Sequence, residues 1–181
     1  MTKPLFLYLL LLVLPICTIA QPLDLSFEFQ AYPTGLIPGI QIEKGFGEKD
    51  ALHLRLGYQY IRHGDFGVHE DERGDGYGFS LGYKHYLKEN FTGWFWGLRN
   101  DLWWNTLDWK DNIGTSNEIG GTTEIVVVQP TAMAGYLFEL GETGFFTPSI
   151  AFGFEVNVQT EGEETGQGAI LLLGFEIGKR F

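Results

Sequence analysis

Apolar and polar residues alternate one by one along most of the chain after residue 20. In the stretch 23–32, for example, Leu23, Leu25 and Phe27 alternate with Asp24 and Ser26. A period of two is typical of a β-strand with two different faces, whereas an amphipathic helix repeats every 3.6 residues. The pattern predicts strands over residues 23–32, 39–46, 51–62, 76–87, 94–105, 124–140, 145–158 and 169–181.

The connections between these strands alternate in length. Short polar segments at 47–50, 88–93 and 141–144 alternate with long ones at 63–75, 106–123 and 159–168. The first connection, 33–38 with its two prolines, is the exception: it is short although it lies at the end of the barrel where the other connections are long. Short turns at one end and long loops at the other are typical of a barrel inserted from the periplasm. We therefore expect one domain, residues 21–181, folded as an all-β, eight-stranded antiparallel up-and-down transmembrane β-barrel.

The two strand faces differ in a way that indicates which one meets lipid. The apolar face carries more Phe, Tyr, Trp and Leu side chains than the narrow interior of an eight-stranded barrel can hold. The polar face instead alternates long charged residues with glycines such as Gly57, Gly82, Gly97 and Gly153. Small residues beside large ones can pack a narrow lumen, whereas glycines only weaken a solvent-facing strand. A β-sandwich, which could bury the aromatic residues between two sheets, remains the alternative.

The first twenty residues have the features of a secretory signal peptide. Lys3 precedes the apolar run Leu5–Leu14, and small residues lead to a cleavage point after Ala20. The apolar run is shorter than the ~20 residues of a transmembrane helix. Lipid attachment at Cys17 is an alternative, but the residues before it lack the small side chain of a lipidation signal. Because Cys17 is the only cysteine, the mature chain has no disulfide.

The charge of the chain limits its partners. With a formal net charge of −11, it is not expected to bind nucleic acid by charge neutralisation. No cofactor or metal site is predicted. Catalysis would need a nucleophile, a base and an orienting carboxylate, and the chain has no His-x-Ser pair. His63 and Asp65 lie in one expected loop and Ser116 lies in another, so the three would meet only by accident of folding. We therefore expect no enzymatic activity, and a lipid A-modifying enzyme is the least favoured of the alternatives.

The end of the chain resembles the last strand of small bacterial outer-membrane β-barrels, the broad group that includes OmpA transmembrane domains, OmpX and OmpW. Gly174, Phe175, Ile177 and the terminal Phe181 fit this strand, whereas Lys179 departs from it because that position is usually apolar. The stretches 82–87 and 93–97 are also similar to hairpins of such barrels.

This resemblance, which covers essentially the whole mature chain, implies an outer-membrane location in a Gram-negative cell. We also expect contact with outer-membrane lipid and lipopolysaccharide, and a monomeric protein. Phe175, Ile177 and Phe181 would form the C-terminal signal that the barrel-assembly machinery reads during insertion.

The charged residues on the polar face are the candidate functional set. Charges of both signs should pair inside a narrow barrel, since an unpaired buried charge is costly. We interpret them as a polar plug that supports a structural, envelope or surface-binding role, with a narrow solute channel as the alternative. The set comprises Glu28, Glu43, Arg55, Lys84, Arg99, Asp101, Glu155, Glu176 and Arg180.

Three local features need separate expectations. Pro130 and Pro148 lie within strands and remove ladder donors, so we expect β-bulges there. Asn100 falls on the lipid face, where it would mark a bulge, a switch toward the lumen or a protein contact. The many acids of the loop 63–75 are interpreted as a solvated acidic surface, with weak binding of divalent cations as the alternative.

Overall fold

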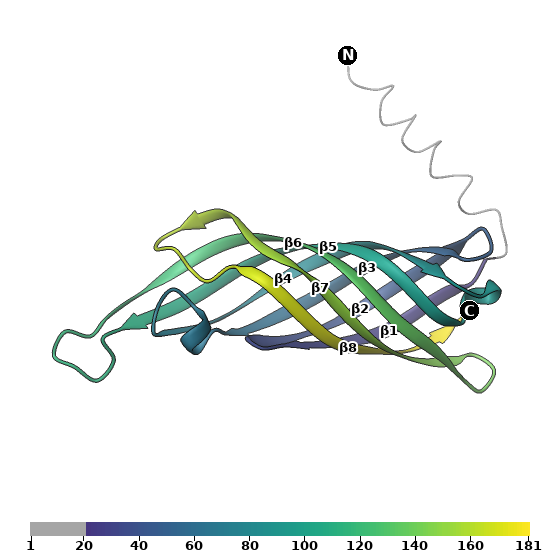
Figure 1. Ribbon diagram of the computed structural model, residues 1–181, viewed down its shortest axis with the longest axis horizontal. Coiled ribbons are helices and arrows are strands. Elements are labelled where there is room, and N and C mark those ends of the chain that lie inside the picture. Colours follow the sequence, from purple (N-terminus) through teal and green to yellow (C-terminus); the bar gives the residue numbers. More distant parts are fainter. Residues whose placement is uncertain (1–20) are drawn as a thin grey trace, which may run out of the picture.

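The chain forms a closed barrel of eight strands in which each strand is antiparallel to its two neighbours. The computed structural model describes residues 21–181; the signal peptide predicted for residues 1–20 lies outside the described residues. Figure 1 shows long hairpins at one end of the barrel and tight turns, together with the C-terminus, at the other. The elements are β1(Leu23–Tyr32), β2(Gly35–Phe46), β3(Asp50–Arg62), η2(Gly64–Phe66), β4(Asp71–Tyr86), η3(Glu89–Phe91), β5(Gly93–Asp111), β6(Ile119–Leu140), β7(Gly144–Glu161) and β8(Gly168–Arg180).

The predicted eight-stranded up-and-down barrel is confirmed, but several strands are longer than expected. The expected loop 106–123 shrinks to residues 112–118, because β5 and β6 stay paired from Asp111 and Ile119 inward. This outer part of the hairpin is held by polar contacts, such as the Thr122 hydroxyl that donates to Asp108 at 2.6 Å. The strand ends were predicted from the points where apolar alternation stops, but hydrogen-bonded pairing of the two strands continues past these points.

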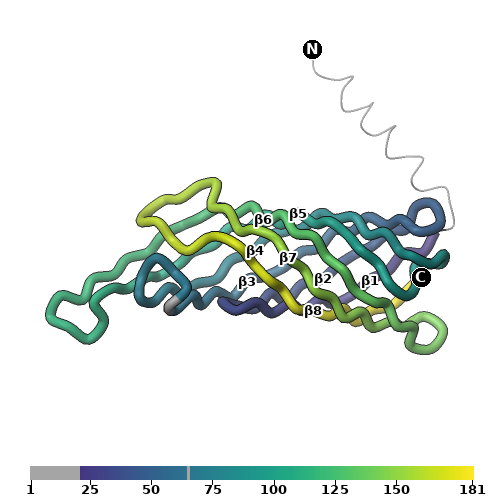
Figure 2. The backbone as a smooth tube through the Cα atoms, in the orientation of Figure 1, coloured from purple at the N-terminus to yellow at the C-terminus, as the bar shows by residue number. Residues whose placement is uncertain are grey.

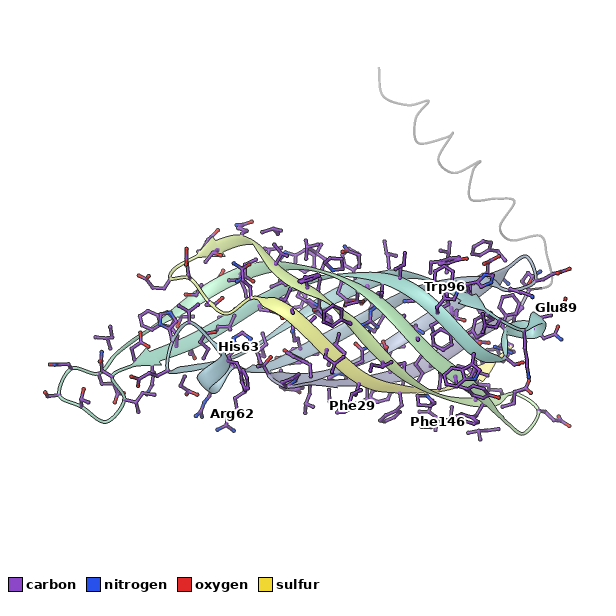
Figure 3. All side chains as sticks on the ribbon, in the orientation of Figure 1. Phe29, Arg62, His63, Glu89, Trp96 and Phe146 are labelled. Carbon is purple, nitrogen blue, oxygen red and sulfur yellow. The ribbon has the colours of Figure 1, made fainter. Side chains whose placement is uncertain are left out.

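The outer surface of the barrel is a continuous apolar belt. Leu56, Tyr77 and Trp94 each expose 60% or more of their surface on it. At the seam of the barrel, where β8 pairs with β1 and closes the sheet, three aromatic rings form a row. The ring centroid of Phe175 lies 5.8 Å from that of Phe29 and 5.9 Å from that of Phe146. Figure 3 shows Phe29, Phe146 and Trp96 along this surface. An outward apolar face on a closed barrel is the arrangement of a transmembrane barrel, and it excludes the β-sandwich.

Aromatic residues gather at both edges of this belt. Toward the long hairpins, Tyr77 and Trp104 stack with centroids 6.0 Å apart, and Tyr60 lies on the same side. Toward the tight turns, Trp94 meets Tyr136 edge to face at 5.2 Å. Such girdles mark the two membrane interfaces of transmembrane barrels. Between residues 21 and 181, no helix has the length and apolar character needed to cross a membrane.

The interior contains large apolar residues as well as the expected polar ones. Trp103 is completely buried among the lumen residues of β5, where its ring occupies the space left by two glycines. A Cβ atom at Gly78 would lie 2.4 Å from the Trp103 ring, and one at Gly57 would lie 2.9 Å from it. The lumen glycines thus make room for bulky partners, as their alternation with large residues suggested.

The bulges expected at the two prolines are absent. The pairs Val128↔Val156 and Thr131↔Gly153 keep one register on either side of Pro130. Pro148 pairs with Phe175 in an unshifted ladder with β8. The only register shift between β6 and β7 lies elsewhere, between Val126 and Val127. Each proline therefore removes a hydrogen bond without inserting an extra residue.

Candidate functional site in the lumen and outer mouth

Four fully buried charges form the centre of the lumen. Glu28 accepts a hydrogen bond from Arg55 Nη1 at 2.8 Å and another from Arg99 Nη1 at 3.0 Å. Asp101 Oδ1 lies 3.1 Å from Arg55 Nη2 and 3.1 Å from Arg99 Nε. Two cations and two anions therefore balance each other where no side chain reaches solvent. We call these four residues the central cluster.

Neutral polar side chains complete the central cluster. Gln30 Oε1 accepts hydrogen bonds from Arg55 Nη1 at 2.6 Å and from Arg99 Nη2 at 2.9 Å. Ser80 Oγ accepts another from Arg55 Nε at 2.9 Å. Each guanidinium therefore has several acceptors, which offsets the cost of removing its charge from water.

A second buried cluster lies nearer the tight turns. Lys84 Nζ is 2.8 Å from Glu43 Oε2 and 2.8 Å from Glu176 Oε1. The Tyr86 hydroxyl donates to Glu43 at 2.8 Å, and Gln41 Nε2 donates to Glu176 at 3.0 Å. One ammonium and two neutral donors thus hold two carboxylates together in the lumen.

The two clusters explain how like charges can face each other across a strand pair. Glu28 and Glu176 are direct partners in the β1–β8 ladder. Their carboxylates turn to different cations, Glu28 to the two arginines and Glu176 to Lys84. Each carboxylate therefore has its own cationic partners, which offsets the unfavourable repulsion across the seam.

Arg180, which the sequence assigned to the lumen face, lies near the end of the barrel and apart from the central cluster. Its guanidinium forms two hydrogen bonds to Asp24, and it also donates to the carbonyl oxygens of Asn90 and Phe91 at 3.0 and 3.1 Å. These carbonyls belong to η3, where both residues adopt positive φ angles. Arg180 therefore ties the β4–β5 turn to the barrel seam, and the buried Phe91 ring closes this end against Tyr86.

Glu72 organises the opposite mouth, although the sequence placed it in a solvated acidic loop. Its side chain is completely buried and lies 2.5 Å from the His63 ring. It also accepts hydrogen bonds from the backbone N–H groups of Val68, His69 and Gly166 at 2.7, 3.1 and 3.1 Å. Because Gly166 belongs to the β7–β8 connection, one carboxylate fastens loops from opposite sides of the mouth. We call this arrangement the mouth cap.

The mouth cap lies beyond the apolar belt, since Glu72 is five residues past the girdle residue Tyr77 along β4. Burial raises the pKa of the Glu72 carboxyl, but the hydrogen bonds from His63 and the three backbone N–H groups outweigh burial and lower the pKa to about 2. The carboxylate is therefore ionised at neutral pH. Nearby, the hydrogen bond from the His69 ring lowers the pKa of Asp111, and the His69 ring stacks on Trp109 at 4.2 Å.

Glu155 is the exception to the expected pairing of lumen charges. Only 6% of its surface is exposed, and its Oε1 atom has no hydrogen-bond partner among residues 21–181. The sequence assigned Glu155 to the lumen face with charges that should pair as a set, and among the described residues Glu155 has no salt-bridge partner.

Several interior residues were missing from the candidate set: the neutral ones because the set contained only charged residues, and Asp24 although it is charged and lies in an expected strand. Gln30 and Ser80 are on the polar face of their strands, and Asp24 alternates with Leu23 and Leu25, so the strand pattern could have found all three. Glu72 was missed because β4 begins earlier than its apolar pattern indicates.

His53 is also buried and missing from that set. Neither of its ring nitrogens has a hydrogen-bond partner in the described part of the chain.

The structure gives no support to the other candidate chemistry. Ser116 is exposed in the turn 112–118, whereas His63 is bound to Glu72 at the mouth. The side chain of Asp65 lies outside the described residues. No group of three or more potential metal ligands gathers among the side chains described for residues 21–181.

The proposed insertion residues lie on the outer surface, and Phe181 continues the seam. Phe181 exchanges backbone hydrogen bonds with Leu23 at 2.9 and 3.2 Å. The Lys179 ammonium lies 5.2 Å from the centre of the Phe181 ring, a cation–π contact that accounts for a lysine on this face. Asn100 lies on the outer surface opposite Pro130, and nothing in the structure explains it.

Comparison with known proteins finds structural similarity to two solved β-barrels. The N-terminal β-barrel domain of Pseudomonas aeruginosa OprF is 14% identical over 88% of this chain and 97% of that chain, with a TM-score of 0.47. Neisserial surface protein A is 11% identical over 88% of this chain and 94% of that chain, with a TM-score of 0.40. No protein-family model matches the chain, and no curated protein is similar to it in sequence.

Proposed function

We propose that this protein is a monomeric outer-membrane β-barrel with a closed lumen, which supports the envelope and presents its mouth and hairpins to the cell exterior. The observation that carries the proposal is the central cluster. Glu28, Arg55, Arg99 and Asp101 are fully buried and bonded to one another across the barrel. A solute would have to break several charge-assisted hydrogen bonds to pass.

The surroundings of the central cluster support a closed lumen. Trp103 fills the space next to it, with its ring 5.4 Å from the Arg55 guanidinium carbon. Toward the tight turns, the Lys84 cluster and the buried Phe91 ring follow, and toward the hairpins lies the mouth cap. Polar clusters and buried aromatic rings thus occupy the lumen from the tight turns to the mouth.

The outer surface supports the membrane location. The apolar belt and its two girdles need a lipid environment, since a soluble monomer rarely exposes so large an apolar patch. The resemblance of residues 169–181 to terminal barrel strands supports insertion by the barrel-assembly machinery. The acidic hairpins would then face the lipopolysaccharide surface.

Fractionation and gel migration test the location. We expect the protein in isolated outer membranes, with faster migration before boiling than after it. Recovery in the soluble periplasmic fraction, with the same migration under both conditions, would contradict the membrane proposal.

Planar-bilayer recording tests the closed lumen. We expect no stable unitary conductance from the natural protein. The double substitution Arg55→Ala with Arg99→Ala should introduce conductance, because it removes both central cations and much of the plug volume. A control with Arg62→Ala and Arg73→Ala, two arginines at the outer end, should stay silent. Reproducible channels from the natural protein would favour the alternative, a narrow path for small solutes.

A further inference from the structure

The barrel wall is lower at its seam than elsewhere around the mouth. Pairing between β1 and β8 ends at Ala31↔Leu173, although β8 continues to Gly168. Residues 168–172 therefore pair only with β7. On the other side of the seam, the β1–β2 hairpin turns at Pro33 and Thr34. Figure 2 shows this purple hairpin ending well short of the β5–β6 hairpin.

A cavity of about 330 Å³ lies at this low point and crosses the wall. From the lumen side it is lined by Tyr32, Glu155 and Ile170, which are all buried. From the outer side it is lined by Phe152 and Leu171, which are neighbours in the β7–β8 ladder and belong to the apolar belt. One continuous cavity therefore connects the lipid-facing surface with the interior of the mouth.

The cavity has an acidic side chain at its inner end. The Glu155 carboxylate is more than nine-tenths buried, and its Oε1 atom lacks a hydrogen-bond partner among the described residues. His63 also lines the cavity, but its Nδ1 atom is already engaged by Glu72. A buried carboxylate without a cation is costly, so the site favours a ligand that brings its own positive charge.

The outer end of the cavity has the opposite character. Phe152 and Leu171 expose about half of their surfaces to the belt, and Phe66 of η2 exposes 76% of its surface above them. An alkyl chain that extends from the cavity along Phe152 and Leu171 would stay in contact with apolar groups and lipid. The two ends of the cavity therefore match the two ends of an amphiphile.

We propose that this lateral cavity binds the primary ammonium head of an amphiphile, with the head at Glu155 and the hydrocarbon tail passing between β8 and the β1–β2 hairpin. Tyr32 positions the head. Its hydroxyl oxygen accepts a hydrogen bond from Gln59 at 2.8 Å and keeps a second lone pair that can accept a hydrogen bond from the ammonium. This proposal rests on the proposed outer-membrane location in one respect, namely that the ligand enters the cavity from the lipid side.

Photolabelling tests this site in the refolded full-length mature barrel. The probe is dodecylamine with a diazirine near its head, added to the barrel in phosphatidylcholine nanodiscs, and labelled residues are identified by mass spectrometry. We expect labelling to concentrate on residues 152 and 168–171. Glu155→Gln should reduce it about tenfold, because a charge-assisted hydrogen bond is replaced by a neutral contact. Labelling that is spread evenly over the belt, or equal in the natural protein and Glu155→Gln, would overturn the proposal.

Three controls make the result specific. Glu161→Gln, an exposed acid on the same strand, should label like the natural protein. A diazirine-bearing dodecanol should label the site weakly, because it has the same tail without the charge. Leu171→Trp should reduce labelling by filling the outer end while it leaves Glu155 in place. Faster gel migration before boiling, checked for every variant, separates failure of this site from failure of the barrel to form.

A competition experiment distinguishes two sources of the ammonium. Phosphatidylethanolamine in the nanodisc would suppress labelling if the site takes a membrane lipid with an aminoethyl head. Suppression by soluble octylamine alone would assign the site to amines that arrive from the medium. Persistence of the same labelling in the presence of both competitors would overturn a saturable ammonium site.

Discussion

Arg180 binds Asp24 through two parallel hydrogen bonds, Nε to Oδ1 at 2.8 Å and Nη2 to Oδ2 at 2.7 Å. The pair links the last strand to the first at the end where the chain closes on itself. We predict that Asp24→Ala lowers the free energy of unfolding by about 2 kcal/mol, since it leaves a partly buried guanidinium without its carboxylate. Urea titration of the refolded barrel, followed by gel migration without boiling, measures this change.

Ser26→Ala is the matched control for the seam. Ser26 is the next lumen-facing residue of β1 and is equally buried. We expect its truncation to cost much less, because no charge loses its partner. Equal urea midpoints for the two variants would show that the ion pair does not contribute to closure.

Gly82 is the small residue that makes room for His53 in the lumen. A Cβ atom at Gly82 would lie 2.2 Å from His53 Nε2. We predict that Gly82→Ala destabilises the barrel by about 1–3 kcal/mol through overpacking, and that it costs much less in a His53→Ala background. The measurement is a double-mutant cycle from urea midpoints. His85→Ala provides the control cycle, because His85 lies on the outward face of β4; here the two destabilisations should add. If they also added in the cycle with His53→Ala, the steric explanation would be contradicted.

The sequence was sufficient to predict which face of each strand points to the lumen and which points outward. Alternation alone assigned Leu54 and Leu56 to the outside and Arg55 to the lumen, because side chains on a strand point to opposite faces in turn. It could also anticipate that lumen charges pair in general. The partners themselves require the register, since Lys84 meets Glu176 across 92 residues of chain.

The sequence was less informative about the ends of the barrel. β5 continues to Asp111 although its apolar pattern fades after Asn105, because polar side chains can sustain a ladder outside the lipid. The unpaired state of Glu155 depends on the low wall at the seam and on the path of the β7–β8 connection. Neither of these leaves a periodic signal in the residues.

Phe181 contributes both a backbone link and an exposed ring. We predict that deletion of Phe181 lowers the amount of protein in the outer membrane, because it removes the proposed insertion signal together with the hydrogen bonds to Leu23. Phe181→Ala keeps the backbone and should lower the amount as strongly if the ring is what the assembly machinery reads. Quantitative immunoblots of outer membranes measure both variants. Phe138→Ala, which removes another exposed aromatic ring, is the control and should be inserted normally.

Glu72 should make the mouth cap sensitive to acid. Its pKa of about 2 lies below the ordinary value of 4.5, so the folded state favours the ionised carboxylate. The stabilisation is therefore fully present above about pH 4.5 and is lost as the pH falls toward 2. We predict that the amide resonances of Val68, His69 and Gly166 keep their positions down to about pH 4 and then shift together. NMR of the refolded barrel between pH 7 and pH 2 measures the transition.

Glu72→Gln separates this effect from general acid denaturation. The amide keeps one acceptor oxygen but loses the charge, so it cannot hold His63 and three backbone N–H groups as the carboxylate does. At neutral pH the Gly166 resonance of this variant should already lie near its acidic position, while resonances of the belt stay unchanged. Glu118→Gln, in the exposed turn of the β5–β6 hairpin, should leave Gly166 unaffected. If Gly166 in Glu72→Gln behaved as in the natural protein, the carboxylate could not be what fastens the β7–β8 connection across the mouth.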